Sequence, residues 1–151
     1  MKRLFFIILF TAVYSGLHAQ KVVTWELLSK ITWAKAYVEE LEGYYDLPRF
    51  HADIKAIDGQ EVIISGFAIP LEVGSKTIAI SSKPMVSCFF CTGAGPESVA
   101  EVIINKDDTS FDKIRVDQFI KIKGTIKTNR RDPEHLMYII ENVKLLEVSK
   151  P

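Results

Sequence analysis

The sequence predicts a mainly β protein, and three features support this prediction. Short stretches of alternating or β-branched residues, separated by turn residues, recur from about residue 51 to residue 148. Two of the longer stretches carry a central glycine, Gly66 and Gly124, which lets a strand curl. The chain after its first 19 residues is long enough for only one hydrophobic core. We therefore expect a small OB-like Greek-key barrel of about five to six strands with an N-terminal amphipathic helix.

The first 19 residues have the features of a cleavable signal peptide. Two basic residues precede an apolar run over residues 4–13, and the small residue Ala19 stands just before Gln20. This run is shorter than the roughly 20 apolar residues that span a bilayer, although an N-terminal anchor that stays in place is the alternative. We expect residues 1–19 to be removed, and residues 20–151 to form a single β-rich OB-like domain that is periplasmic or secreted.

Residues 24–42 are expected to form the amphipathic helix. Apolar residues recur there at steps of four and three, as they do on one face of a helix, and these are Leu27, Ile31, Ala34, Val38 and Leu41. Thr24 is a suitable N-cap, and Gly43 is suited to end the helix. The aromatic residues outside this face are Trp25, Trp33 and Tyr37. They are expected to pack on the barrel or to stay partly exposed.

The remaining elements follow in chain order. Residues 44–48 are typical of a turn, and residues 51–57 begin the β-rich region and lead into the Asp58-Gly59 dipeptide, which suits a tight hairpin. The strands expected after this turn cover residues 61–71, 77–81, 99–105, 119–127 and 137–148.

Residues 119–127 have the clearest alternation in the chain. Ile120, Ile122 and Ile126 alternate with three lysines, so that only one face of the strand is apolar. We therefore expect these three isoleucines to face the core of the barrel.

Charge and motifs exclude several classes of function. The chain has 19 basic and 19 acidic residues, and without Lys2 and Arg3 it has 17 basic residues. Such a nearly neutral chain lacks the basic excess that holds phosphate backbones, so nucleic acid is not an expected partner. The sequence contains no Gly-x-Ser-x-Gly, His-Glu-x-x-His or Walker motif, and we therefore expect a protein that is not an enzyme.

The most unusual motif is the CxxC pair formed by Cys88 and Cys91. Two thiolates at this spacing can bind one metal ion, and zinc favours four tetrahedral ligands. His135, just before the last expected strand, is the candidate nitrogen ligand, because a closed barrel could bring it near the cysteines. We expect a zinc site made by Cys88, Cys91 and His135, completed by an oxygen ligand or water; copper is the alternative, since thiolates also suit Cu(I).

Two other interpretations of the cysteine pair remain open. The pair could cycle between dithiol and disulfide, although the chain lacks the βαβ alternation in which thioredoxin-like motifs occur. It could also be a buried or oxidised pair that only shapes a loop. A covalent haem site is excluded, because Thr92 stands where that motif requires histidine.

Three segments together resemble a known group of proteins: DGQEVIISGFAIPLE, SCFFCTGAGPESVAEV and HLMYIIENVKLLE. The chain resembles a family of small secreted proteins of unknown function from Gram-negative bacteria, related to exported OB-like domains of unknown function, and the resemblance covers about residues 25–147. The CFFCxGAGPES loop is specific to the group. In the broader relatives a single cysteine precedes a histidine and a proline-rich stretch, and Cys88 matches that cysteine. The resemblance implies an envelope protein that serves a transporter or a metal-handling system.

We therefore expect an exported, non-enzymatic binding protein that holds a transition metal through its CxxC loop. A thiol-disulfide redox protein and a pure protein-interaction module of the cell envelope are the alternatives. The expected partner is an envelope transporter or another envelope protein.

Overall fold

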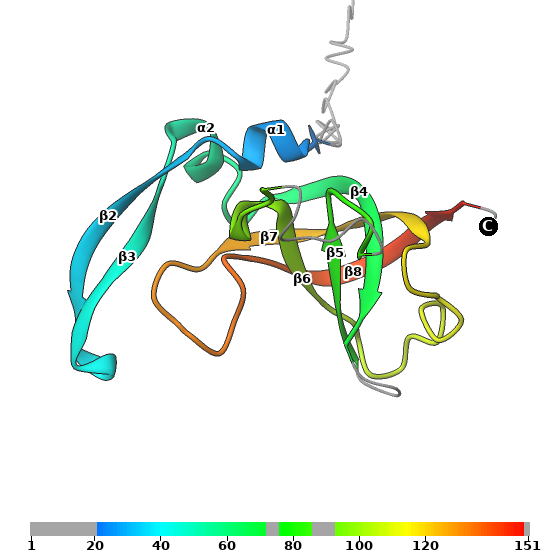
Figure 1. Ribbon diagram of the computed structural model, residues 1–151. Helices are drawn as coiled ribbons and strands as arrows, with labels where there is room; N and C mark the ends of the chain where they lie inside the picture. The colour runs from blue at the N-terminus through cyan, green and yellow to red at the C-terminus, as the bar shows by residue number, and fades with distance from the viewer. Residues whose placement is uncertain (1–20, 72–75, 86–92, 150–151) are drawn as a thin grey trace, which may run out of the picture.

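The computed structural model describes residues 21–71, 76–85 and 93–149 (Figure 1). In chain order, with η marking a 3-10 helix, the elements are β1 (Lys21–Val22), α1 (Trp25–Leu28), β2 (Ile31–Val38), η1 (Glu39–Leu41), β3 (Gly43–Phe50), α2 (Ala52–Lys55), β4 (Glu61–Pro70), β5 (Thr77–Ser81), η3 (Pro96–Ser98), β6 (Val99–Ile103), β7 (Phe119–Thr128) and β8 (Tyr138–Val148). Within these ranges no helix is long and apolar enough to cross a membrane. The expected signal peptide, residues 1–19, lies outside the described residues.

Five strands close into a barrel, which confirms the predicted fold class. They follow one another in the order β4-β5-β6-β8-β7, and β7 pairs again with β4. Strands β6 and β8 are parallel, and the other neighbours in the barrel are antiparallel. The short strand β1 adds to β4 in parallel. The arrangement is that of a small OB-like barrel, and all five strands expected after residue 60 are present with bounds close to those predicted.

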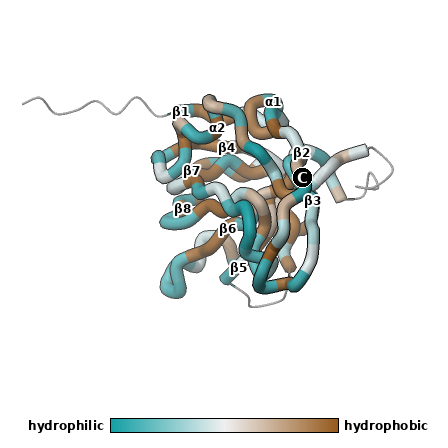
Figure 2. Tube along the Cα trace, turned by 90° about the vertical axis from the view of Figure 1, so that its left-hand side faces the viewer, coloured by the Kyte–Doolittle hydropathy of each residue, from teal (hydrophilic) through white to brown (hydrophobic). Residues whose placement is uncertain are grey.

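The barrel interior holds the core. Ile120, Ile122 and Ile126 are fully buried, which confirms that the apolar face of β7 points inward. Hydrophobic and hydrophilic residues alternate along β7, and hydrophobic residues are frequent in the barrel strands (Figure 2). Tyr138 closes the core toward α1, because its hydroxyl donates a 2.6 Å hydrogen bond to the Leu28 carbonyl. Burial raises the pKa of this hydroxyl.

Both mid-strand glycines lie where the barrel needs room or curvature. A Cβ on Gly66 would lie 2.5 Å from the Ser81 carbonyl oxygen and 3.2 Å from the Trp25 ring. The pairing of β7 with β8 shifts register between Lys123 and Thr125, on either side of Gly124. Glycine at position 66 therefore permits a close approach of two strands, and an irregularity of the kind that lets a strand curl lies around Gly124.

The prediction of one helix over residues 24–42 is wrong beyond its first turn. Thr24 does cap a helix, through a 3.2 Å hydrogen bond from the Leu27 amide, but this helix ends at Leu28. Residues 31–38 instead form β2, which pairs along its whole length with β3. Their apolar spacing suits a helix, but β-branched and aromatic residues prevail among them and favour a strand once a partner strand is present.

Two neighbouring predictions are also corrected. Residues 44–48, expected as a turn, lie inside β3, and residues 51–57, expected to begin the β-rich region, contain α2. The His51 imidazole caps α2 by accepting a hydrogen bond from the Asp53 amide at 3.3 Å. The β2–β3 hairpin extends to one side of the barrel, with β3 between β2 and the barrel (Figure 1).

Candidate functional site

His135 is the one predicted site residue that the structure describes, and a buried carboxylate holds it. It lies in the loop between β7 and β8, directly before β8. Its Nδ1 is 3.0 and 3.1 Å from the two carboxylate oxygens of Glu101 on β6. Glu101 is only 8% exposed, and it also accepts a 3.1 Å hydrogen bond from the Leu136 amide. Glu101 therefore fixes both the imidazole and the backbone beside it.

Local side-chain hydrogen bonds give the loop before His135 its shape. The Asn129 amide group donates to the carbonyls of Asp132 and His135, at 2.7 and 3.0 Å. The Asp132 carboxylate accepts from the Glu134 amide at 3.0 Å. Asn and Asp form such bonds to nearby backbone readily, and this is why the segment makes an ordered turn that presents His135 to Glu101.

The Glu101 carboxylate also sets the protonation of the imidazole. Its hydrogen bond and charge raise the pKa of His135 above the ordinary value, with smaller contributions from Asp132 and Glu134. When the ring is neutral, the Nδ1 proton is held toward the carboxylate, and Nε2 carries the lone pair. Histidines that bind metals are commonly oriented by a carboxylate in this way.

Sequence reasoning did not identify Glu101. Its signal is a single acidic residue within the otherwise apolar stretch Val99–Ile104. On strand β6 its neighbours Ala100 and Val102 belong to the core, and Glu101 points to the other face. There it is covered because β6 pairs with β8, which brings the His135 loop over it.

Cys88 and Cys91 lie outside the described residues, so their convergence with His135 stays a prediction. The structure describes the chain on either side of the two cysteines, up to residue 85 and from residue 93 onward. On the N-terminal side, the Met85 amide donates to the Asp117 carboxylate, and on the C-terminal side η3 leads into β6. Because β6 and β8 run parallel, β6 begins at the same end of the barrel as β8, which follows His135. Among the residues that are placed, no group of three or more His, Cys, Asp or Glu is positioned to hold a metal ion.

The β2–β3 hairpin carries the most exposed aromatic surface of the described residues. Four of its rings, here called the hairpin aromatics, are 43 to 74% exposed: Trp33, Tyr37, Tyr44 and Tyr45. Tyr37 and Tyr44 face each other across the strands with ring centroids 5.3 Å apart. A cleft of about 240 Å³ separates the hairpin from the His135 loop, and residues 45–48 and 129–133 line much of it.

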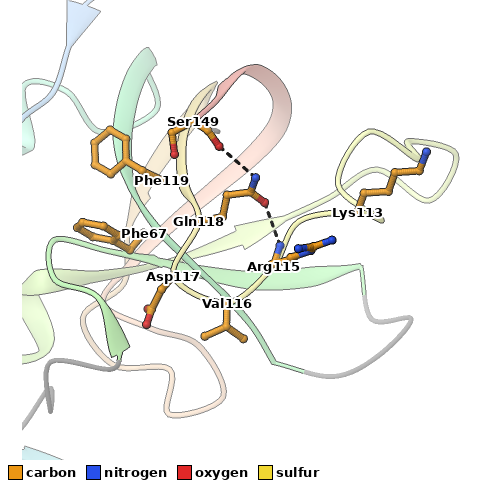
Figure 3. A pocket seen from close by; sticks show the side chains of 8 residues that line it. All are labelled: Phe67, Lys113, Arg115, Val116, Asp117, Gln118, Phe119 and Ser149. Carbon is orange, nitrogen blue, oxygen red and sulfur yellow. Dashed lines mark hydrogen bonds between the residues drawn. The ribbon is translucent and has the colours of Figure 1, made fainter. Parts of the chain in front are cut away.

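A pocket of about 440 Å³ lies at the other end of β7 (Figure 3). Phe67 and Phe119 form one wall of it, with ring centroids 5.1 Å apart in an edge-to-face contact. The side chains of Lys113 and Arg115 point away from these rings. The polar and aromatic groups drawn there do not converge as they do in typical ligand sites.

The His135–Glu101 pair predicts a pH dependence of stability, to be measured with a chelator present. Because the folded state raises the pKa of His135 above its ordinary value of 6.5, the stabilisation by the charged pair is complete below that pH. It is lost as the pH rises through the folded-state pKa. The unfolding free energies of wild type and His135→Gln, measured in urea from about pH 5 to pH 8, should therefore differ most at the acidic end.

Glu101→Gln serves as the control for this prediction, since it keeps a hydrogen-bonding group but removes the charge. The pKa of His135, followed by NMR, should fall toward its ordinary value in this variant. A difference between wild type and His135→Gln that does not change with pH would contradict the prediction.

Comparison with known proteins finds no family model that matches this sequence and no curated protein significantly similar to it. The resemblance to small secreted proteins of Gram-negative bacteria therefore stays a prediction.

Proposed function

We propose that this chain is an exported, non-enzymatic binding protein that holds a transition metal ion. Cys88 and Cys91 supply two thiolates, and His135 supplies an imidazole nitrogen. Zinc is the expected metal because it accepts such a mixed set of sulfur and nitrogen ligands, and Cu(I) is the alternative. An envelope transporter or another envelope protein is the proposed partner, in the periplasm or outside the cell.

The observation that carries this proposal is the buried Glu101 carboxylate on His135 Nδ1, at 3.0 and 3.1 Å. This arrangement leaves Nε2 as the metal-binding nitrogen and keeps the ring in one orientation. An acidic side chain that is 8% exposed is costly to bury, and in this position it orients a ligand. The parallel pairing of β6 and β8 supports the proposal further, because the cysteine-bearing loop returns to the barrel through β6.

The test is the metal content of protein purified without chelators. We expect about one ion per chain in the wild type, loss of the ion in Cys88→Ser, and weaker binding with an intact fold in His135→Ala. His51→Ala is the matched control, because His51 caps α2 and should not affect metal content. Metal binding should also protect both thiols from alkylation until a chelator is added. Metal-free protein with two unprotected thiols would contradict the proposal.

Counting the reactive thiols distinguishes the thiol-disulfide alternative from the metal site. A thiol-disulfide protein should show two further reactive thiols after reduction, whereas a metal site should release them on chelation alone.

The hairpin aromatics favour a second candidate function, that of a protein-interaction module. Exposed Trp and Tyr side chains gathered on one projecting element are typical of interaction surfaces, where such residues supply much of the binding energy. This function requires no metal, and a protein without metal that still binds its partner would favour it over the first candidate.

A further inference from the structure

Strand β2 is an open edge of a small sheet. Among the described residues it pairs only with β3, and the two strands form a sheet of their own. Strand β3 lies between β2 and the barrel (Figure 1), and its residues 45–48, together with Trp33 and Val38 of β2, line the cleft that faces the His135 loop. A two-stranded sheet is marginally stable alone, and an exposed strand edge readily pairs with another strand.

The two strands of the hairpin differ in how their edges are protected. Strand β3 contains Asp46, Pro48 and Arg49, and proline lacks the amide hydrogen that edge pairing needs. Strand β2 contains no proline, and Lys35 is its only charged residue. The outer edge of β2 is therefore the one suited to accept a further strand.

One face of β2 presents Ile31, Trp33, Lys35 and Tyr37 in succession. Trp33 is 47% exposed and Tyr37 52% exposed. A strand that pairs favourably with this edge places apolar or cationic groups opposite the Trp33 and Tyr37 rings, and a group that binds a cation opposite the Lys35 ammonium.

We propose that a second copy of this chain pairs antiparallel with β2, joining two hairpins into one four-stranded sheet. This pairing supplies the partner for the protein-interaction module described above as the second candidate function, and it does not depend on the metal site. In such a pair a two-fold axis places one residue opposite itself. The registers with the longest overlap of Ile31–Val38 centre on Ala34 or on Lys35.

Charge decides between these two registers. Centring on Lys35 sets two ammonium groups directly opposite each other, which is destabilising. Centring on Ala34 sets Lys35 opposite Trp33 of the second copy, twice per dimer, and Ile31 opposite Tyr37. A cation over an indole ring and a β-branched residue beside an aromatic ring are both favourable pairs. The strand is thus complementary to itself in one register.

An introduced cysteine tests this register directly. In Ala34→Cys the two new thiols lie opposite each other, with Cα atoms about 4.5 to 5.5 Å apart, within the range of a disulfide. Mild oxidation should give a covalent dimer, and peptide mapping should place the bond at position 34. In Ala36→Cys, the matched control, the thiols are about 13 Å apart and should not link. Links formed equally in both variants, or in neither, would overturn the proposal.

The association itself is measured by sedimentation of the wild-type protein, which should show a dimer. Lys35→Glu should weaken the dimer about tenfold or more, because two cation–π contacts per dimer are lost. Lys55→Glu makes the same change of charge on α2 and should not alter the dimer. Wild-type protein that is monomeric would overturn the proposal and leave a different protein as the occupant of β2. Lys35→Glu should keep its metal, and Cys88→Ser should keep its dimer, so that the two proposals fail separately.

Discussion

Replacing Ile122 with Ala is expected to lower the free energy of unfolding by about 2 to 5 kcal/mol, the range for truncating a buried large aliphatic side chain. Ile122 is fully buried at the centre of β7, where it lies opposite Ile64 of β4. Both neighbouring strands hold the backbone of β7, so the barrel cannot collapse into the space that the side chain leaves. Urea or thermal unfolding of the purified variant measures the change.

Leu146→Ala is the matched control for this experiment. Leu146 lies on β8 and is 40% exposed, so its truncation leaves no closed cavity. The expected change is within about 0.5 kcal/mol. A change below about 0.5 kcal/mol for Ile122→Ala would place that side chain on the surface and contradict the register of β7.

Replacing Gly66 with Val is expected to lower the free energy of unfolding by about 3 kcal/mol or more. The first added atom alone would lie 2.5 Å from the Ser81 carbonyl oxygen and 2.9 Å from Ile80 Cγ1. Ser81 cannot move away easily, because it pairs with both Phe67 and Val99. The strands must therefore separate at the point where β4 stops pairing with β7 and begins to pair with β5.

Ser65→Val introduces the same side chain at the adjacent position of β4, which points to the opposite face of the strand. Its effect is expected to stay below about 1 kcal/mol. Comparable losses in the two variants, measured by denaturant unfolding, would mean that β-branching and not the close approach to Ser81 is responsible.

The strands of the barrel were predictable because each of them carries its own signal. Alternation in β7, with Ile122 at its centre, requires one buried face whatever the partner strand is. Gly66 and Gly124 likewise mark places where a strand must curl or approach another closely. These features are local, and local periodicity is the information that a single sequence carries most clearly.

The hairpin was not predictable in this way, because residues 31–38 carry conflicting signals: their apolar spacing suits a helix, whereas their β-branched and aromatic residues favour a strand. Their apolar residues fall on one face of a helix, yet the same segment pairs with residues 43–50 as a strand. The outcome depends on the partner strand, which contains Pro48 and was expected to form a turn. Tertiary pairing overrides local spacing when both structures are sterically allowed.

For the candidate site, the sequence alone singled out His135 and the CxxC pair by residue type and spacing. Only the tertiary structure decided what holds His135, because Glu101 lies 34 positions earlier in the chain and reaches it through the parallel pairing of β6 with β8. A contact across that separation leaves no periodic trace in the sequence. Local alternation thus determined the barrel and its core. The projecting hairpin depended on the pairing of two neighbouring strands, and the carboxylate on the histidine depended on two segments that meet only when the barrel closes.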